Sequence, residues 1–247
     1  MAQRKASEKA SSQTLKAVLG IRELVFSGEV SPGERLSEVN LSARLGLSRT
    51  PIRAGLARLE QEGILELIPS GGYTVRSFSE ADIVDAIELR GVLEGTAARL
   101  AAERGISPSR LVSMKAILAE IDKVVSGPGD AFDFPRYAEM NAEFHDLLKV
   151  LSGSEIVARE IDRVMRLPFA GPSAFLNAQP DIPAFRTSLV VGQAQHRAIA
   201  HAIEMREGAR AEAVAREHSR LARQNLDFVM DDHKLMARVP GLMLVSG

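Results

Sequence analysis

Residues 37–76 read SEVNLSARLGLSRTPIRAGLARLEQEGILELIPSGGYTVR and contain the clearest local signals in the chain. Leu41 and Leu45 lie four residues apart, as on one face of a helix, and Gly46 fits the end of that helix. Ser48 then suits the cap of a second helix, with Pro51 in its first turn. The stretch therefore predicts two short helices joined by a tight turn.

The second predicted helix has an apolar stripe and a basic leading edge. Arg49 and Arg53 lie at its amino-terminal end, off the stripe. The stripe itself consists of Ile52, Leu56 and Leu59. In helix-turn-helix proteins the first residues of the second helix approach the edges of DNA bases, which is where these arginines lie.

A two-stranded wing is predicted after this helix. Gly63 suits a left-handed helix end, and residues 64–68 and 73–76 are apolar or β-branched segments on either side of Pro-Ser-Gly-Gly. A basic amphipathic helix alone is more often a solvated surface helix than a DNA contact. The helix, turn, basic helix and glycine-tipped hairpin together favour a DNA reader.

This combination resembles the winged helix-turn-helix of the GntR family of bacterial transcription regulators, over about residues 14–78. The resemblance implies double-stranded operator DNA as a partner. Family members usually have Glu-Ala where this chain has Ala54-Gly55, and a glycine inside a helix costs about 1 kcal/mol. The predicted DNA-binding residues are Arg35, Arg44, Ser48, Arg49, Thr50, Arg53, Gly71 and Gly72.

Composition limits the possible classes of protein. The chain has 247 residues, 45% of them hydrophobic, which is enough for two domains or one large domain with a real core. It has no cysteine, so disulfides and cysteine-based zinc sites are excluded. The first residues lack the apolar core of a signal peptide, and no run of 18 apolar residues occurs. We therefore expect a cytoplasmic protein with no membrane partner.

The net charge of -1 is unevenly distributed along the chain. Residues 1–78 contain 11 basic and 8 acidic residues, a surplus of +3, and the remainder contains 20 and 24, a surplus of -4. A surplus of three positive charges binds DNA phosphates weakly. This charge favours a homodimer that places two readers on one DNA.

The rest of the chain is predicted to be helical, so the fold class is mainly α: a winged helix-turn-helix of three helices and a two-stranded wing, then an all-α bundle of about six helices. The predicted helices are 79–104, 107–126, 133–152, 154–167, 185–207 and 209–231, separated by Gly and Pro breaks. Residues Phe169 to Pro183 read as an irregular loop, either a lid or a plain connection. The predicted domains are a disordered tail (1–13), the DNA-binding domain (14–78), the helical domain (79–231) and a tail (232–247), which either docks or is disordered.

Three histidines occupy inward-facing positions of predicted helices. Asn141 and His145 are four residues apart and so project from one helix face. His196 and His218 lie on opposite sides of the break at Gly208, as on neighbouring antiparallel helices. A single histidine is more often a structural residue than a ligand. A bundle core can nevertheless gather the three imidazoles and the amide oxygen around a divalent metal ion.

This histidine pattern resembles the FCD effector-binding domain of the FadR subgroup of the GntR family, over about residues 79–230. The resemblance implies a divalent ion (zinc, nickel or manganese) held by Asn141, His145, His196 and His218, and a small carboxylate effector. Many FCD domains have Asp at the position of Asn141. A neutral amide is a weaker ligand, so we expect partial metal occupancy and an extra positive charge for an anion. Arg90 is the predicted effector contact.

The function predicted from these features is a dimeric regulator, a repressor whose hold on operator DNA changes when a small carboxylate binds. Two alternatives remain: a metal-responsive regulator, and a metal-dependent hydrolase in which an open metal position activates water. No HExxH motif supports the hydrolase, and an enzyme has no use for a winged helix. The chain is therefore predicted not to be an enzyme.

Overall fold

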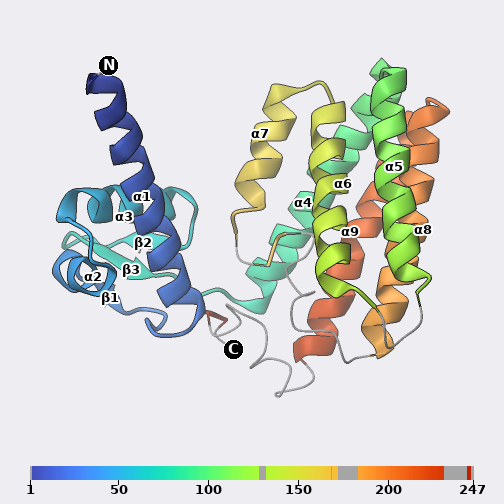
Figure 1. Cartoon of the computed structure of the whole chain (residues 1–247). Coiled ribbons are helices and arrows are strands. Elements are labelled where there is room, and N and C mark those ends of the chain that lie inside the picture. The colour runs from blue at the N-terminus through green and yellow to red at the C-terminus, as the bar shows by residue number, and fades with distance from the viewer. Residues whose placement is uncertain (1, 128–131, 168, 172–182, 231–243, 246–247) are drawn as a thin grey trace. The chain divides into compact units, whose positions relative to one another are not determined.

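The structure is a computed structural model that describes residues 2–127, 132–167, 169–171, 183–230 and 244–245 (Figure 1). The chain divides into two compact units, one formed by Met1–Asp82 with Pro240–Gly247 and one by Ile83–Val239. The described part of the chain is mainly helical, with one small antiparallel sheet in the first unit. This confirms the predicted fold class.

The first unit opens with a long helix, α1 (Ala2–Phe26). The sequence predicted a disordered tail over residues 1–13, and the start of α1 at Ala2 corrects that prediction for residues 2–13. These residues contain neither glycine nor proline, and most of them are good helix formers such as Ala, Gln, Lys and Glu.

The helix-turn-helix consists of α2 (Glu38–Leu45) and α3 (Arg49–Gln61). The side chain of Ser37 accepts a hydrogen bond from the backbone N–H of Asn40 and caps α2. Gly46 ends α2 in the left-handed conformation, with φ of 64°. Ser48 lies at the cap position of α3, but its side chain makes no capping hydrogen bond.

The sheet contains β1 (Arg35–Leu36), β2 (Leu65–Leu67) and β3 (Tyr73–Val75), in the order β1-β3-β2 and antiparallel throughout. The wing hairpin β2–β3 was predicted, and its register pairs Glu66 with Thr74. Strand β1 was missed, because a two-residue strand has no period that a sequence can reveal. Gly71 and Gly72 turn the hairpin with φ values of 85° and 96°, which side chains other than glycine rarely adopt.

The packing around Gly55 explains why this chain has a glycine where family members usually have alanine. It is buried where α3 packs against α1, and a Cβ added there would lie 3.1 Å from the Cβ of Ala17 and 3.3 Å from the backbone N of Val18. Glycine therefore allows a close approach of the two helices. The closest atoms belong to small or backbone groups, which have little freedom to move aside.

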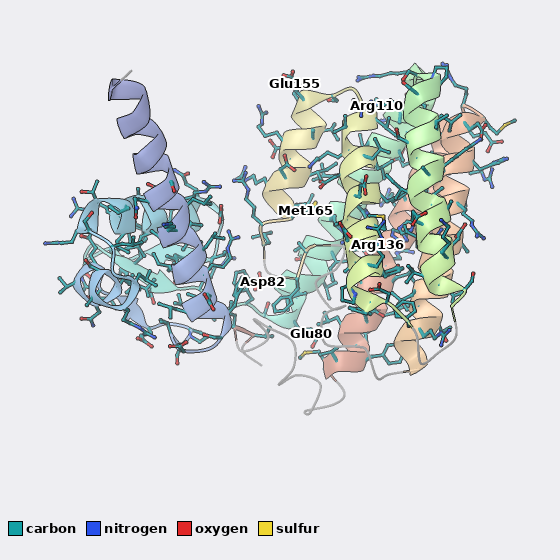
Figure 2. The ribbon with its side chains drawn as sticks, in the orientation of Figure 1. Glu80, Asp82, Arg110, Arg136, Glu155 and Met165 are labelled. Atoms are coloured by element: carbon teal, nitrogen blue, oxygen red, sulfur yellow. The ribbon has the colours of Figure 1, made fainter. Side chains whose placement is uncertain are left out.

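The second unit contains α4 (Glu80–Arg104), α5 (Pro108–Val125), α6 (Phe134–Leu151), α7 (Glu155–Val164), α8 (Pro183–Glu204) and α9 (Gly208–Met230). Serine caps start α5 and α7, and Asp133 caps α6. At the start of α4, Ser79 and Asp82 cap each other reciprocally (Figure 2 labels Asp82). The backbone N–H and the hydroxyl of Ser79 both donate to Oδ2 of Asp82 and lower the pKa of this carboxyl group.

One apolar core joins α4, α5, α6, α8 and α9, with Phe144, Met114, Ile121, Ile199 and Ile203 among its buried residues. Helix α4 approaches α9 closely at two glycines. A Cβ at Gly91 would lie 2.1 Å from Oγ of Ser219, and one at Gly95 would lie 2.8 Å from Cγ of Arg216. This close crossing brings the polar face of α4 into the interior of the bundle.

The predicted loop Phe169 to Pro183 lies mostly outside the described residues, so the choice between lid and connection stays open. Phe169 has a positive φ of 65°, and both Phe169 and Ala170 are buried.

Within the portions of the chain that are described, no helix combines the length and apolar character needed to cross a membrane.

Candidate functional site

The two arginines at the start of α3 are exposed and share one carboxylate. The side chains of Arg49 and Arg53 are 62% and 66% exposed. Glu38, the first residue of α2, accepts hydrogen bonds from Arg53 Nε at 2.9 Å, Arg53 Nη2 at 3.0 Å and Arg49 Nη2 at 3.2 Å. The hydrogen bond from Arg53 contributes most to lowering the pKa of Glu38. Both guanidinium groups are therefore held side by side at the exposed start of α3.

The other predicted DNA-binding residues lie on the same unit. Arg35 on β1 donates from Nη2 to the carbonyl oxygen of Gly71 at 2.8 Å, which ties it to the wing tip beside Gly72. Arg44 forms an exposed ion pair with Glu29. Ser48 and Thr50 are exposed at the start of α3. Contact of any of these residues with DNA stays a prediction.

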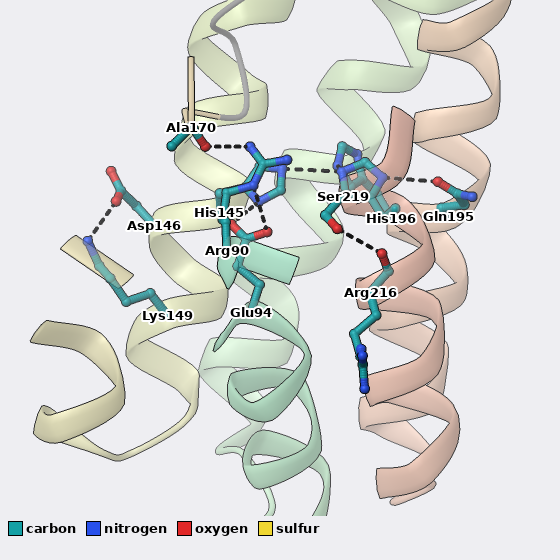
Figure 3. Close-up of polar contacts among 11 residues, drawn as sticks. Arg90, Glu94, His145, Asp146, Lys149, Ala170, Gln195, His196, Arg216 and Ser219 are labelled. Carbon is teal, nitrogen blue, oxygen red and sulfur yellow. Dashed lines mark hydrogen bonds and ion pairs between the residues drawn. The ribbon is translucent and has the colours of Figure 1, made fainter. Parts of the chain in front are cut away.

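In the second unit the three predicted histidines meet in the bundle interior, His145 from α6, His196 from α8 and His218 from α9. Figure 3 labels the first two. The Nε2 atom of His218 lies 2.9 Å from Nε2 of His196 and 3.3 Å from Nε2 of His145. Nitrogens bound to one metal at about 2.0–2.1 Å lie roughly 2.9–3.4 Å apart for angles between 90° and the tetrahedral value. The spacing of these atoms fits a shared divalent ion.

The other ring nitrogen of each histidine contacts a side-chain oxygen. Glu94 Oε1 lies 2.8 Å from His145 Nδ1, and Gln195 Oε1 lies 3.1 Å from His218 Nδ1. Gln193 Oε1 lies 3.2 Å from His196 Nδ1. An acceptor oxygen that faces Nδ1 favours the tautomer with its proton on Nδ1. The lone pair of the neutral ring then lies on Nε2.

The neighbours of His196 determine which of its ring nitrogens carries the proton. The amide nitrogen of Gln193 donates to the carbonyl oxygen of Leu118 and to the carboxylate of Asp122, two groups that only accept. Its Oε1 must therefore face Nδ1 of His196, which donates. Together with the carboxylate on His145, this directs two lone pairs toward Nε2 of His218, an arrangement that a cation stabilises.

Glu94 and Arg90, both on α4, form the inner wall of this cluster. Arg90 donates from Nη1 to the carbonyl oxygen of Ala170 at 3.0 Å, and its Nε lies 3.7 Å from Glu94 Oε2. Both side chains are buried. Sequence reasoning selected Arg90 as an effector contact but missed Glu94. The signal that could have found it is the helical spacing of Arg90 and Glu94, four residues apart on the same face.

Burial and charge act in opposite directions on these groups. Burial raises the pKa of Glu94, but His145 and Arg90 outweigh it and lower that pKa to about 2. Burial, with a smaller contribution from His145, holds the pKa of His196 well below its usual value. Burial likewise lowers the pKa of His218. Glu94 is therefore ionised and these two histidines are neutral, the form in which imidazole binds metal.

A cavity of about 40 Å³ adjoins the histidine cluster. Two polar atoms on its lining residues, Nε of Arg90 and Oδ1 of Asn225, are buried and make no hydrogen bond to the described residues. The lining residues are Arg90, Tyr137, Asn141, Ser188, Leu189, Gly192, His218, Leu221, Ala222 and Asn225. The cavity therefore combines a cationic group, amides and apolar side chains.

Asn141 is buried on the same helix as His145 and lines the cavity. Its position on the wall that His218 also lines is compatible with the predicted fourth ligand, which stays a prediction. His201 is exposed, and its Nδ1 lies 3.2 Å from Nη1 of Arg210, so it does not belong to the cluster. His233 lies outside the described residues.

Comparison with known proteins places both units in one family. Residues 13–75 match the family "Bacterial regulatory proteins, gntR family", and residues 85–221 match the FCD domain. The Nta operon transcriptional regulator of Aminobacter aminovorans is 35% identical over 148 residues, 60% of this chain and 68% of that protein. The Glc operon transcriptional activator of Escherichia coli K12 is 25% identical over 233 residues, 87% and 90% of the two chains.

Solved structures show the same fold. E. coli McbR/YncC superimposes with a TM-score of 0.60 at 20% identity, covering 89% of this chain and 97% of that chain. Lar of Listeria monocytogenes superimposes with a TM-score of 0.57 at 18% identity, covering 85% and 96%. The relatives of this chain are transcription regulators rather than enzymes, which removes the hydrolase alternative. The chain belongs to the GntR family, and it is a DNA-binding transcription regulator with an FCD domain.

Proposed function

We propose that this regulator is a homodimeric repressor that leaves its operator when a small carboxylate binds beside a divalent metal ion in the FCD domain. The metal would be held by Asn141, His145, His196 and His218, and the carboxylate would be met by Arg90. The observation that carries this proposal is the convergence of the three Nε2 atoms, with an oxygen on each Nδ1. Zinc, nickel and manganese all accept such ligands.

The charge of the site favours an anionic effector. Arg90 and Glu94 neutralise each other, while the neutral His196, His218 and Asn141 add no charge. When bound, a divalent ion would supply two uncompensated positive charges in a buried place and a Lewis-acid position for an oxygen ligand. A carboxylate offsets this charge, and it also offers a hydrogen-bond acceptor to Nε of Arg90, which makes no hydrogen bond to the described residues.

The cavity limits the size of the effector. A water molecule needs roughly 10–15 Å³ of such space, so a cavity of about 40 Å³ holds about three water-sized groups. This is room for the three heavy atoms of a carboxylate group and little more, so the effector is expected to be a very small acid. Tyr137 and Asn225 supply polar contacts at the wall, and Leu189 and Leu221 supply apolar ones.

A dimer is supported by the weak charge of the reader. One reader domain has a surplus of only three positive charges, and part of its arginine charge is paired with Glu29 and Glu38. Two readers on one operator would double the phosphate contacts and add the half-site spacing as a source of specificity. Effector binding would then act by shifting the population of DNA-compatible dimers.

The proposal is tested by fluorescence anisotropy on an operator selected from genomic DNA with the purified protein. Protein stripped of metal, protein reloaded with zinc, nickel or manganese, and reloaded protein with a panel of small carboxylates are compared. Release of operator DNA only when metal and carboxylate are both present supports the proposal. Release by metal alone would instead show a metal-responsive regulator.

Two sets of variants assign the residues. Arg49→Ala and Arg53→Ala are expected to weaken operator binding at least tenfold while leaving metal content unchanged, with Arg159→Ala on exposed α7 as the control. The double variant His145→Ala, His196→Ala is expected to lose bound metal. Wild-type metal content in that double variant would disprove the metal assignment. A promoter fusion assay distinguishes repression from activation.

A further inference from the structure

A segment far along the sequence lies in the core of the DNA-binding unit. Leu244 has no exposed surface and belongs to the same buried apolar cluster as Ile64, Val75 and Phe78. Its carbonyl oxygen accepts a hydrogen bond of 2.7 Å from the backbone N–H of Phe78. Val245 forms a parallel β-bridge with Phe78. Backbone pairing and side-chain burial therefore hold residues 244–245 against the core of the first unit.

The place where the segment docks is well defined. Phe78 follows three residues after the end of β3, the central strand of the sheet, and is itself 4% exposed. The guanidinium carbon of Arg76 lies 4.9 Å from the centre of the Phe78 ring. Leu244 thus completes an existing core rather than covering an exposed patch, because without it the cluster would lose a fully buried side chain.

We propose that residues 244–245 are an integral docking segment of the DNA reader and attach α9 to it. The chain leaves the first unit after Asp82 and returns to it by Pro240, so two covalent connections join the units. One connection continues into α4, which carries Arg90 and Glu94, and the other comes from α9, which carries His218. Both connections to the reader therefore start from helices of the histidine site. The docking depends only on contacts inside the first unit. It is therefore independent of the proposed binding of metal and carboxylate to the histidine site.

A cysteine pair tests the docking directly, because the natural sequence contains no cysteine. Bridged strands lie about 4.8 Å apart, within the range of Cα separations that a disulfide spans. The double variant Phe78→Cys, Val245→Cys is expected to form a disulfide within one chain under mild oxidation. The control pair is Val39→Cys, Val245→Cys, which uses an exposed valine of α2. A yield no higher than in the control, or a disulfide between two chains, would overturn the proposal.

A second measurement leaves Phe78 in place. Leu244→Ala in the full chain is expected to speed hydrogen exchange of the Phe78 amide at least tenfold and to lower the melting temperature of the reader by at least about 8 °C. Leu19→Ala removes a leucine that is 53% exposed in the same unit and is the matched control. Metal content is expected to stay unchanged in both variants. Equal exchange and melting in the two variants would show that residue 244 is not part of the reader core.

Discussion

Glu94 Oε1 lies 2.8 Å from His145 Nδ1, and both side chains are almost completely buried. The carboxylate only accepts hydrogen bonds when it is ionised, so it places the imidazole proton on Nδ1 and leaves the Nε2 lone pair facing His218. Arg90, 3.7 Å from the same carboxylate, balances its charge. Glu94 therefore orients His145, a predicted metal ligand, without itself facing the three Nε2 atoms.

Replacing Glu94 by Gln is expected to weaken zinc binding about 10- to 100-fold, because the orienting carboxylate and its charge are both lost. Isothermal titration calorimetry of metal-stripped protein with zinc measures this directly. Glu103→Gln, an exposed change on the same helix, is the control. Wild-type zinc affinity in Glu94→Gln would show that His145 needs no such partner.

Replacing Asn141 by Asp is expected to tighten metal binding at least tenfold and to weaken the carboxylate effector. A charged carboxylate is a stronger ligand than an amide, and it removes one of the positive charges that an anion would otherwise offset. Metal content after dialysis and effector-induced release of operator DNA are the two readouts. If both stay at wild-type values, Asn141 neither touches the metal nor sets the charge of the cavity.

Replacing Gly55 by Ala is expected to destabilise the DNA-binding unit by up to about 2 kcal/mol. Alanine improves helix propensity by about 1 kcal/mol, but its Cβ would lie 3.1 Å from Ala17 Cβ and 3.3 Å from Val18 N, and overpacking of this kind costs about 1–3 kcal/mol. Urea unfolding measures the difference. The pair Ala17→Gly, Gly55→Ala should recover part of the loss, and a stabilised single variant would refute the packing explanation.

Replacing Glu38 by Gln is expected to raise affinity for random-sequence DNA about three- to tenfold and to lower the ratio of operator to random binding. The change releases Arg49 and Arg53 from the carboxylate that orients them, so they meet phosphates more freely. Anisotropy with both DNAs gives the ratio. Glu60→Gln at the far end of α3 controls for the lost charge, and an equal effect in both variants would mean that only net charge matters.

Much of the fold followed from local signals in the sequence. Helix ends were predicted within a few residues, because glycines and serine caps such as Gly46 and Ser107 mark them chemically. The predicted helix 185–207 lies at Pro183–Glu204 in the structure. Strand β1 and the first turns of α1 were not predicted, since neither has apolar periodicity.

The residues of the histidine site also fall into those that the sequence predicted and those that it did not. His145, His196 and His218 were found from helical phase and a resemblance, and the structure brings their Nε2 atoms together. Glu94 and Gln193 were not found. The four-residue spacing of Arg90 and Glu94 indicates one shared helix face, but nothing in the sequence indicates that a carboxylate or an amide contacts a histidine on another helix. Contacts of this kind depend on how the helices cross, which Gly91 and Gly95 allow.

The burial of Leu244 bears on how such regulators can be recombined. Domain shuffling and laboratory chimaeras treat an amino-terminal reader as a cassette that is cut at the linker and joined to a new sensor. Here a cassette made of residues 1–82 would lack the leucine that fills its own core. A reader transplanted from this chain needs both pieces, so any new sensor must return its chain to the reader as well as receive it.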